Sequence, residues 1–351
     1  MKVDLNKVLG EFDIESKITE YGDGHINDTY CTEHPRFILQ RINTDIFKNP
    51  DELMENIENV TAHIKDKLER SGKDPERGTL TVVKTRDNKP YIRVYDMVFR
   101  VYKFIENTVT VMNDKRYLEN AGKGFGEFQN MLSDFPIEAL HETIKDFHNT
   151  PERVRKLKKA IEEDRFSRKK EVIDEINFAL EREEMARVVV EGLENKSIPK
   201  RVTHNDTKMN NILFDKDSGE AVCVIDLDTV MPGSVLYDFG DAMRIGASTA
   251  PEDEPCNVSF DTESFELFTK GFLSKTKSTL NEKEIMLLPF SAKLLTYETG
   301  VRFLTDYLNG DTYFKTHYKG QNKNRTKNQF KLVKDIEKKQ TQLEDIVKKL
   351  I

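Results

Sequence analysis

The sequence contains few cysteines, and those present lie far apart. The three are Cys31, Cys223 and Cys256, and no two of them form a Cys-x-x-Cys pair. An odd number of scattered cysteines excludes a disulfide framework. Because proteins that lack disulfides are typical of a reducing compartment, we expect a cytoplasmic location.

The sequence also lacks a long hydrophobic run. Its longest apolar stretches are short, such as residues 221–225, whereas a membrane-spanning helix needs about 20 apolar residues. The first residues carry a charge every few positions and contain no apolar segment of the kind found in signal peptides. We therefore expect no membrane partner.

An excess of basic residues is missing as well. Lys and Arg together number 55 and Asp and Glu 62, which gives a formal net charge of −7. Since nucleic-acid-binding proteins usually show a basic excess or a basic stripe, we expect no nucleic-acid partner. Tryptophan is absent, but 21 Phe and 11 Tyr supply enough apolar surface for a core. The length of 351 residues predicts two domains or one two-lobed domain, at about 150 residues per domain.

The first 105 residues predict a lobe rich in β-structure. Asn49 is a suitable cap and Pro50 a suitable first residue for a helix, and apolar residues follow at spacings of three and four. Residues 79–84 and 91–95 predict a hairpin with a turn at 87–88. Strands are expected in five runs, which are 26–31, 37–42, 79–84, 91–95 and 97–105.

Residues 106–351 predict a second lobe that is mainly helical. The highly charged block 151–197 predicts two helices packed as a hairpin, with the charges on a solvated face. Residues 325–350 predict an amphipathic docking helix, with a short oligomeric coil as the alternative. A β-rich patch at 201–230 interrupts the helical pattern. Further helices are expected at 114–133, 262–275 and 281–309.

Two short apolar runs in this patch enclose a six-residue turn and predict a β-hairpin, with strands at 212–214 and 221–225. Asn211 precedes the first strand and Asp226 follows the second, so the hairpin should bring them side by side. An amide oxygen and a carboxylate suit a hard cation such as Mg²⁺, which binds oxygen ligands together with phosphate. We interpret Asn211 and Asp226 as metal ligands.

Asp206 lies five residues before Asn211, on the loop that leads into the hairpin. A carboxylate there can accept the proton of a hydroxyl that lies in line with a metal-bound phosphate, as phosphoryl transfer requires. His204-x-Asp206-x4-Asn211 has the spacing of the catalytic loop in protein kinases. The alternative is that Asp206 and Asn211 only hold loop turns through side-chain-to-backbone hydrogen bonds.

Asp238-Phe239-Gly240 spells the tripeptide that carries a metal ligand in protein kinases. It lies well past the hairpin, so the argument that brings Asp226 beside Asn211 does not apply to it. We predict that Asp238 is a helix cap or a loop anchor. His148 is expected to be a surface or packing residue, since no metal-ligand spacing surrounds it.

A pair of glycines near the N-terminus predicts a nucleotide-binding loop. Gly22 and Gly24 lie between two expected strands, and glycine lets the backbone approach phosphates closely, although a plain hairpin turn explains the pair nearly as well. The next strand should offer a cation to the phosphates. Gln40 and Arg41 point to opposite faces, and we select Arg41 because it carries the charge. Its acidic partner is expected from the following helix, where the candidates are Glu52, Glu55 and Glu58.

These features resemble the aminoglycoside phosphotransferase and choline kinase superfamily of small-molecule kinases. The resemblance rests on the two-lobed plan, the 204–211 loop and the Ile-Asp-x-Asp strand end at 225–228, and it covers most of the chain. Longer motifs are similar to those of the N-acetylhexosamine 1-kinases, at 24–27, 204–211, 224–233, 236–241 and 300–314. The resemblance implies an α+β, bilobal protein-kinase-like fold with a β-rich N-lobe at 1–105 and a mainly helical C-lobe at 106–351.

The resemblance also implies a function. The chain would phosphorylate the anomeric hydroxyl of GlcNAc or GalNAc, with ATP as phosphate donor and Mg²⁺ as the metal. Asp206 would be the base, while Asn211 and Asp226 would hold Mg²⁺. The sugar contacts implied in the same way are His25, Arg302 and Tyr313.

Two positions depart from the superfamily pattern. Lys208 stands where a His is usual, and a Lys two residues after the base can steady the γ-phosphate, so we include it among the catalytic residues. Gln40-Arg41 stands where a Lys or Arg usually follows the apolar residues directly. Without the resemblance, Arg302 and Asp306 would be interpreted as an ion pair one helical turn apart.

Two alternative functions remain open. A kinase of the same fold could act on another small molecule, such as an aminoglycoside, choline or methylthioribose. A nucleotide-binding module without catalysis is the second alternative, which the presence of Asp206, Asn211 and Asp226 disfavours. The choice between GlcNAc and GalNAc and the oligomeric state are not predicted.

Overall fold

A computed structural model describes residues 3–22 and 26–351, which form two compact units. The first unit contains the described residues up to Thr110 together with 134–145 and 212–232, and the second contains 111–133, 146–211 and 233–351. The first unit is therefore built from three separate stretches of the chain. In the part of the chain that the structure describes, no helix is long and apolar enough to cross a membrane.

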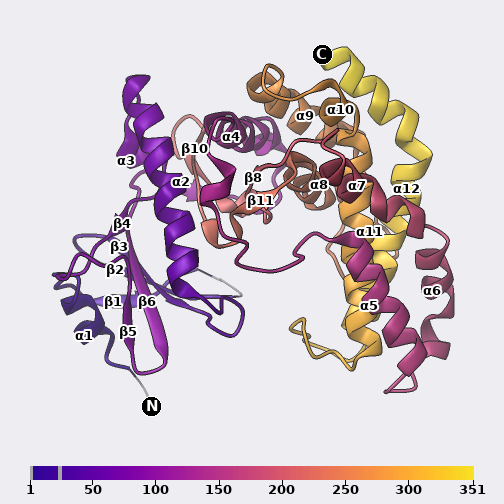
Figure 1. Cartoon of the computed structure of the whole chain (residues 1–351), viewed down its shortest axis with the longest axis horizontal. Coiled ribbons are helices and arrows are strands. Elements are labelled where there is room, and N and C mark those ends of the chain that lie inside the picture. The colour runs from indigo at the N-terminus through magenta and orange to yellow at the C-terminus, as the bar shows by residue number, and fades with distance from the viewer. Residues whose placement is uncertain (1–2, 23–25) are drawn as a thin grey trace. The chain divides into compact units, whose positions relative to one another are not determined.

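An antiparallel sheet forms the centre of the first unit (Figure 1). Its strands are β1 (Ile18–Glu20), β2 (Asp28–Thr32), β3 (Phe37–Ile42), β4 (Val82–Val83), β5 (Ile92–Val94) and β6 (Met97–Lys103). The strand order is β1-β2-β3-β6-β4, and β5 also pairs with β6. The strands predicted at 26–31, 37–42 and 97–105 are thus confirmed, with small shifts at their ends.

The predicted hairpin between 79–84 and 91–95 is wrong. Val82 pairs with Tyr102 and Ile92 pairs with Phe99, so β4 and β5 both lie along β6 instead of along each other. The expected turn exists, since the Thr85 amide donates to the Lys89 carbonyl, but the two strands continue from it as separate partners of β6. Because β6 has five consecutive buried residues, it is the long central strand on which the shorter strands pair.

Helix α2 (Pro50–Arg70) belongs to the same unit as the sheet (Figure 1). It begins as predicted, because Asn49 accepts a hydrogen bond from the Glu52 amide and Pro50 is the first helical residue. Two shorter helices, α1 (Leu5–Gly10) and α3 (Pro75–Gly78), complete the helices of this unit among the described residues. Apolar side chains from α1 and the sheet form a core that includes Val8, Leu39, Phe99 and Val101.

A small second sheet in the first unit contains the predicted hairpin. Its strands are β7 (Thr108–Thr110), β9 (Ile212–Asp215) and β10 (Ala221–Val224), in the order β10-β9-β7. Ile212 pairs with Val224 at one end, so the predicted hairpin is confirmed, with strands that end one residue later and earlier than expected. The chain therefore leaves β10 at the same end at which it enters β9.

The second unit is mainly helical. Its elements are α4 (Leu118–Met131), α5 (Thr150–Glu163), α6 (Ile173–Leu180), α7 (Arg187–Glu194), β8 (Arg201–Thr203), α8 (Val235–Gly246), α9 (Thr262–Thr276), α10 (Glu282–Met286), α11 (Leu288–Leu308) and α12 (Gln321–Leu350). The short strand β11 (Met231–Gly233) lies just before α8. The charged block 151–197 forms three helices instead of the predicted two, because 3₁₀ turns at Lys169–Val172 and Glu183–Ala186 divide it.

Helix α11 runs alongside α12 in this unit (Figure 1). Docking of the last helix is confirmed, since Phe330 and Val333 of α12 share a buried cluster with Tyr297 and Val301 of α11. Close backbone contact joins α4 and α9, because a Cβ added to Gly271 would lie 2.0 Å from the Glu119 carbonyl oxygen. Only glycine permits that approach.

Candidate active site

The loop after β8 has no regular secondary structure, and one buried carboxylate organises it. The backbone amides of His204 and Asn205 donate to Asp238 at 2.9 and 2.7 Å. Asn205 has a φ of +66°, in the left-handed region that Asn tolerates better than most residues. Asp238 lies in the first turn of α8 and is 2% exposed. The prediction that Asp238 is a loop anchor is confirmed.

Further hydrogen bonds to residues of α8 and α4 hold the same loop in place. The Thr207 hydroxyl donates to the Asp238 carbonyl oxygen at 2.6 Å, and the Thr207 amide donates to the Asp241 carboxylate at 3.1 Å. Gln129 of α4 donates to both the Asp238 carboxylate and the Val202 carbonyl, at 2.6 and 3.0 Å. Burial raises the pKa of Asp238, and the hydrogen bonds that it accepts act in the opposite direction. The loop is thus held by side chains where strand or helix bonds are missing.

Asp206 lies on this loop beside a cation and an amide. Lys208 Nζ is 2.7 Å from Asp206 Oδ1. The Asn211 side-chain nitrogen donates to the Asp206 carbonyl oxygen at 2.8 Å and to its carboxylate at 3.2 Å. Three of the predicted site residues are therefore brought together. Neither of these bonds uses the Asn211 amide oxygen, which is the atom that a metal would require.

The charges around Asp206 keep it ionised. Burial alone would raise the pKa of its carboxyl, but the Lys208 ammonium outweighs this effect and holds the pKa below its usual value. Burial likewise acts to lower the pKa of Lys208, and Asp206 raises it above its usual value. The side chain of Asp206 is 20% exposed and that of Lys208 is 42% exposed, so both are accessible from solvent.

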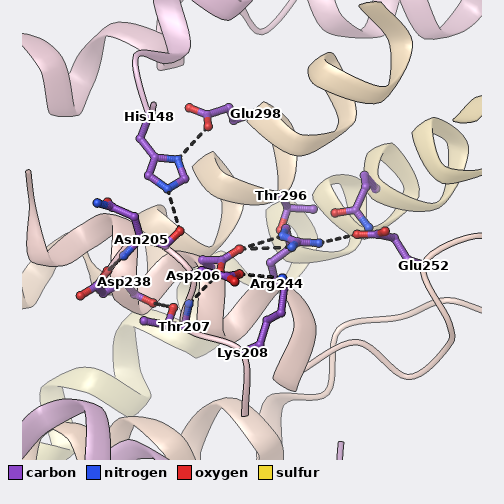
Figure 2. A network of polar contacts seen from close by, with 12 residues as sticks. His148, Asn205, Asp206, Thr207, Lys208, Asp238, Arg244, Glu252, Thr296 and Glu298 are labelled. Carbon is purple, nitrogen blue, oxygen red and sulfur yellow. Dashed lines mark hydrogen bonds and ion pairs between the residues drawn. The ribbon is translucent and has the colours of Figure 1, made fainter. Parts of the chain in front are cut away.

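His148 links this loop to helix α11. Figure 2 shows its ring between Glu298 and the backbone of Asn205. Its Nδ1 is 2.8 Å from the Glu298 carboxylate and its Nε2 is 3.4 Å from the Asn205 carbonyl oxygen. His148 is buried, which confirms the expectation of a packing residue, although no sequence pattern indicated its contact with the loop.

Arg302 and Tyr313 lie around one aromatic ring in the second unit. The Arg302 guanidinium carbon is 5.5 Å from the centre of the Phe314 ring, and the Tyr313 ring centre is 4.8 Å from it. The ion pair with Asp306, which was the alternative interpretation of Arg302, is absent from the described part of the chain. Instead, Asp306 accepts hydrogen bonds from the backbone amides of residues 312–314, at 2.8 to 2.9 Å. This carboxylate shapes the turn that carries Tyr313.

A second guanidinium lies near Arg302. Arg153 donates to the Phe147 carbonyl oxygen at 2.7 Å, and the Phe147 ring centre lies 5.8 Å from the Arg302 guanidinium carbon. Burial and, next, the charge of Arg302 lower the pKa of Arg153. The Nε atom of Arg153 is buried without a hydrogen-bond partner, and within the described residues neither guanidinium forms an ion pair. Arg153 Nε is therefore a buried donor without an acceptor, while the carboxylates of Glu298 and Asp146 compensate part of the charge in this region.

In the first unit, Asp226 follows β10 and begins a tight turn. It has a φ of +60° and precedes the 3₁₀ turn Leu227–Thr229. The hairpin end at Ile212 and Val224 places residue 211 before one strand and residue 226 after the other, as predicted. Asn211 belongs to the second unit and Asp226 to the first, so their joint role as metal ligands stays a prediction.

The predicted nucleotide loop connects β1 and β2, which pair antiparallel. Gly22 has a φ of +74°, and a Cβ at this position would face open space. Gly24 and His25 lie outside the described residues. Arg41 is exposed and pairs with Asp28, whereas Gln40 faces the opposite side and accepts from Arg100 at 2.8 Å. The roles of Gly22 and Arg41 in binding phosphate remain predictions.

Two of the three candidate carboxylates on helix α2 contact residues other than Arg41. Glu55 is 2.9 Å from His141, and Glu58 pairs with Lys84. The buried guanidinium of Arg100 instead pairs with Asp228, at 2.5 Å. Sequence reasoning missed Arg100, because a charged residue within an apolar strand gave no sign of its partner far along the chain.

Comparison with known proteins identifies the family of this chain. The model of the phosphotransferase enzyme family, APH, matches residues 17–258. The structure of an aminoglycoside phosphotransferase from Alicyclobacillus acidocaldarius is similar, with 14% identity, a TM-score of 0.63, and coverage of 100% of this chain and 97% of that one. A microcompartment-associated aminopropanol kinase is 15% identical, with a TM-score of 0.61 and coverage of 97% and 98%.

A choline kinase from Streptococcus pneumoniae is also similar, with 12% identity, a TM-score of 0.54, and coverage of 92% of this chain and 93% of that one. At these identities the solved structures show the fold, which is α+β and kinase-like, with a sheet-rich N-terminal region and a mostly helical C-terminal region. The expected fold class is confirmed. Since the family model matches more than half of its residues, the chain belongs to the phosphotransferase enzyme family.

Proposed function

We propose that this protein is an ATP-dependent kinase that phosphorylates the anomeric hydroxyl of an N-acetylhexosamine to give the sugar 1-phosphate. The observation that carries the proposal is the ionised Asp206 held between Lys208 and Asn211 on an anchored loop. The motifs at 204–211, 224–233 and 300–314, which are similar to those of the N-acetylhexosamine 1-kinases, support the choice of substrate.

In the proposed reaction, Asp206 orients the anomeric hydroxyl and accepts its proton. The sugar oxygen then forms a bond to the γ-phosphorus of ATP while the bond from that phosphorus to the β-phosphate oxygen breaks, which yields ADP and the sugar 1-phosphate. Because an anomeric hydroxyl is more acidic than an ordinary alcohol, a carboxylate is an adequate base. Most of the rate enhancement comes from positioning and from neutralisation of charge.

The donor atoms at the hairpin fit a magnesium ion. Asn211 offers an amide oxygen and Asp226 a carboxylate, and hard cations prefer such oxygen ligands. We assign both residues to Mg²⁺, which when bound supplies positive charge to the phosphates of ATP. Lys208 adds a second positive charge next to the base, and we propose that it stabilises the γ-phosphate.

The surplus of donors around Arg302 supports a neutral substrate with acceptor oxygens. Arg302 and Arg153 can donate to hydroxyl or acetamido oxygens, and Tyr313, which is 67% exposed, can stack on a sugar ring. Two guanidinium groups disfavour a cationic substrate such as choline or an aminoglycoside, with part of their charge compensated by the buried carboxylate of Glu298. We therefore favour the N-acetylhexosamine over these rivals.

The substrate is tested by ADP production from ATP and Mg²⁺ with a panel of acceptors. We expect turnover with GlcNAc or GalNAc and none with choline, an aminoglycoside or methylthioribose. The methyl glycoside of GlcNAc is the matched control, since its anomeric oxygen is blocked and it should not react. Phosphorus NMR of the product then locates the phosphate. Equal turnover of the methyl glycoside would contradict phosphorylation at the anomeric position.

Replacement of Arg302 by Gln is expected to raise KM for the sugar roughly 10- to 100-fold, the loss of a hydrogen bond from a charged donor. KM for ATP should change little, because the proposed contact is with the sugar alone. Steady-state kinetics with each substrate varied in turn measure both values. The control is Arg182→Gln, whose guanidinium also lies over an aromatic ring, 3.7 Å from the centre of Phe178. A sugar KM unchanged by Arg302→Gln would remove this residue from the binding site.

A further inference from the structure

The first unit contains a guanidinium that is almost completely buried. The Arg100 side chain is 1% exposed and projects from the central strand β6. A buried cation is tolerated only when it is paired and hydrogen-bonded. Asp228 is 2.5 Å from its Nη2 atom, and Gln40 Oε1 accepts from its Nε and Nη2 atoms at 3.1 and 2.8 Å. Arg100 therefore connects β6 to β3 and to the turn that contains Asp228.

Asp228 is similarly buried: its Oδ2 atom accepts a hydrogen bond, whereas its Oδ1 atom forms an ion pair without a hydrogen bond of regular geometry. Its side chain is 3% exposed, with Oδ1 facing Arg100 and Oδ2 accepting from the Asn27 amide at 2.6 Å. The Asn27 side-chain oxygen in turn accepts from the Asn43 amide at 3.0 Å. The second acidic residue of the Ile-Asp-x-Asp strand end is thus occupied by protein partners, and we exclude it as a metal ligand.

The turn that Asp228 holds also carries Asp226. Asp226 lies two residues earlier, in the left-handed region at the start of the 3₁₀ turn Leu227–Thr229. A non-glycine residue keeps such a backbone conformation only when its surroundings determine it. Fixing Asp228 therefore also restricts where the Asp226 carboxylate can point.

We propose that Arg100 is a positioning residue for the magnesium site: by holding Asp228, it fixes the turn that presents Asp226 to the metal. The proposal rests on the proposed function, because it assumes that Asp226 binds Mg²⁺. Arg100 itself touches neither metal nor substrate. Its electrostatic environment agrees with this placement: burial acts to lower the pKa of its guanidinium, whereas Asp228 and, more weakly, Asp226 raise it.

The competing explanation is that Arg100 and Asp228 only stabilise the fold. The second unit offers a matched pair for this case, since Arg201 is 2.6 Å from Glu284 and the two side chains are 15% and 0% exposed. Each arginine forms an ion pair with a buried carboxylate and also donates to a second acceptor. That acceptor is the Gln40 side chain for Arg100 and the Thr279 carbonyl oxygen for Arg201. A conservative change in either should lower stability, but only the change in Arg100 should affect the metal.

The test compares Arg100→Lys with Arg201→Lys in the full chain. Binding of Mn²⁺, as a spin-active substitute for Mg²⁺, is measured by electron paramagnetic resonance in the presence of a non-hydrolysable ATP analogue, and the Tm of each variant is recorded. We expect Arg100→Lys to weaken Mn²⁺ binding about 10- to 100-fold, the range found when a group that orients the ligands of a metal is changed. Arg201→Lys should leave Mn²⁺ binding unchanged even where its Tm falls.

A double variant keeps the test decisive if Arg100→Lys unfolds. Arg100→Met with Asp228→Asn removes both charges together, so that neither is left buried without its partner. Weak Mn²⁺ binding in a folded double variant supports the positioning role, whereas normal binding in either Arg100 variant overturns it. Equal weakening in Arg201→Lys overturns it too. A wild-type protein that binds no Mn²⁺ with the nucleotide would refute the proposed kinase itself, and the inference with it.

Discussion

Replacement of Asp206 by Asn is expected to lower kcat by roughly 10²- to 10⁴-fold, the usual contribution of a general base. The amide keeps the shape of the side chain but cannot accept the proton of the sugar hydroxyl. Affinity for ATP should be retained, since Asp206 is proposed to contact the acceptor hydroxyl and not the nucleotide. Stopped-time assays of ADP release give kcat, and calorimetry gives the ATP dissociation constant.

The variant also removes the ion pair with Lys208, which lies 2.7 Å away, and this effect must be separated from loss of the base. Lys208→Met serves that purpose, because it removes the pair but leaves the carboxylate. Asp217→Asn, on the exposed hairpin turn, controls for an unspecific loss of charge. Full activity in Asp206→Asn would end the assignment of this residue as the base.

Replacement of Asp226 by Asn or Ala is expected to abolish the dependence of the rate on Mg²⁺ and to lower kcat by roughly 10²- to 10³-fold, as when one stabilising group is removed from a transition state. Asn is the more informative change, since it tolerates the φ of +60° at this position. The rate measured as a function of Mg²⁺ concentration tests the prediction.

A second aspartate provides the control for backbone effects in the same unit. Asp13 also has a positive φ, of +56°, and is exposed on the surface beside Arg86. Asp13→Asn should therefore leave the magnesium dependence unchanged. If Asp226→Asn retains the magnesium response of the natural protein, the metal ligand must be sought elsewhere.

Several local features were predictable because short-range chemistry determines them. The start of α2 follows from Asn49 and Pro50, and the β9–β10 hairpin follows from two apolar runs around a polar turn. The grouping of Asp206, Lys208 and Asn211 could also be anticipated, since all three lie within six consecutive residues. The role of Asp238 as a loop anchor was also predicted, from its position well past the hairpin.

Other features depend on partners that lie far apart in the chain. β4 and β5 both pair with β6, and the composition of the two strands does not indicate that they share this neighbour. The bond between Asn27 and Asp228 joins residues 201 positions apart, and no local pattern indicates it. Likewise, Gln129 and Asp241 gave no sign of supporting the loop at 204–211, because their role depends on how α4 and α8 pack beside it.

The three-part construction of the first unit has a consequence for its biosynthesis. Strands β1 to β6 are made early, but the carboxylate that compensates Arg100 is not available until residue 228 has been translated. A buried cation that lacks its partner is strongly destabilising, by about 3–5 kcal/mol. We therefore expect the nascent sheet to stay incompletely folded on the ribosome until most of the chain has emerged. A fragment that ends at residue 110 would likewise be an unsuitable independent module for crystallisation or domain fusion.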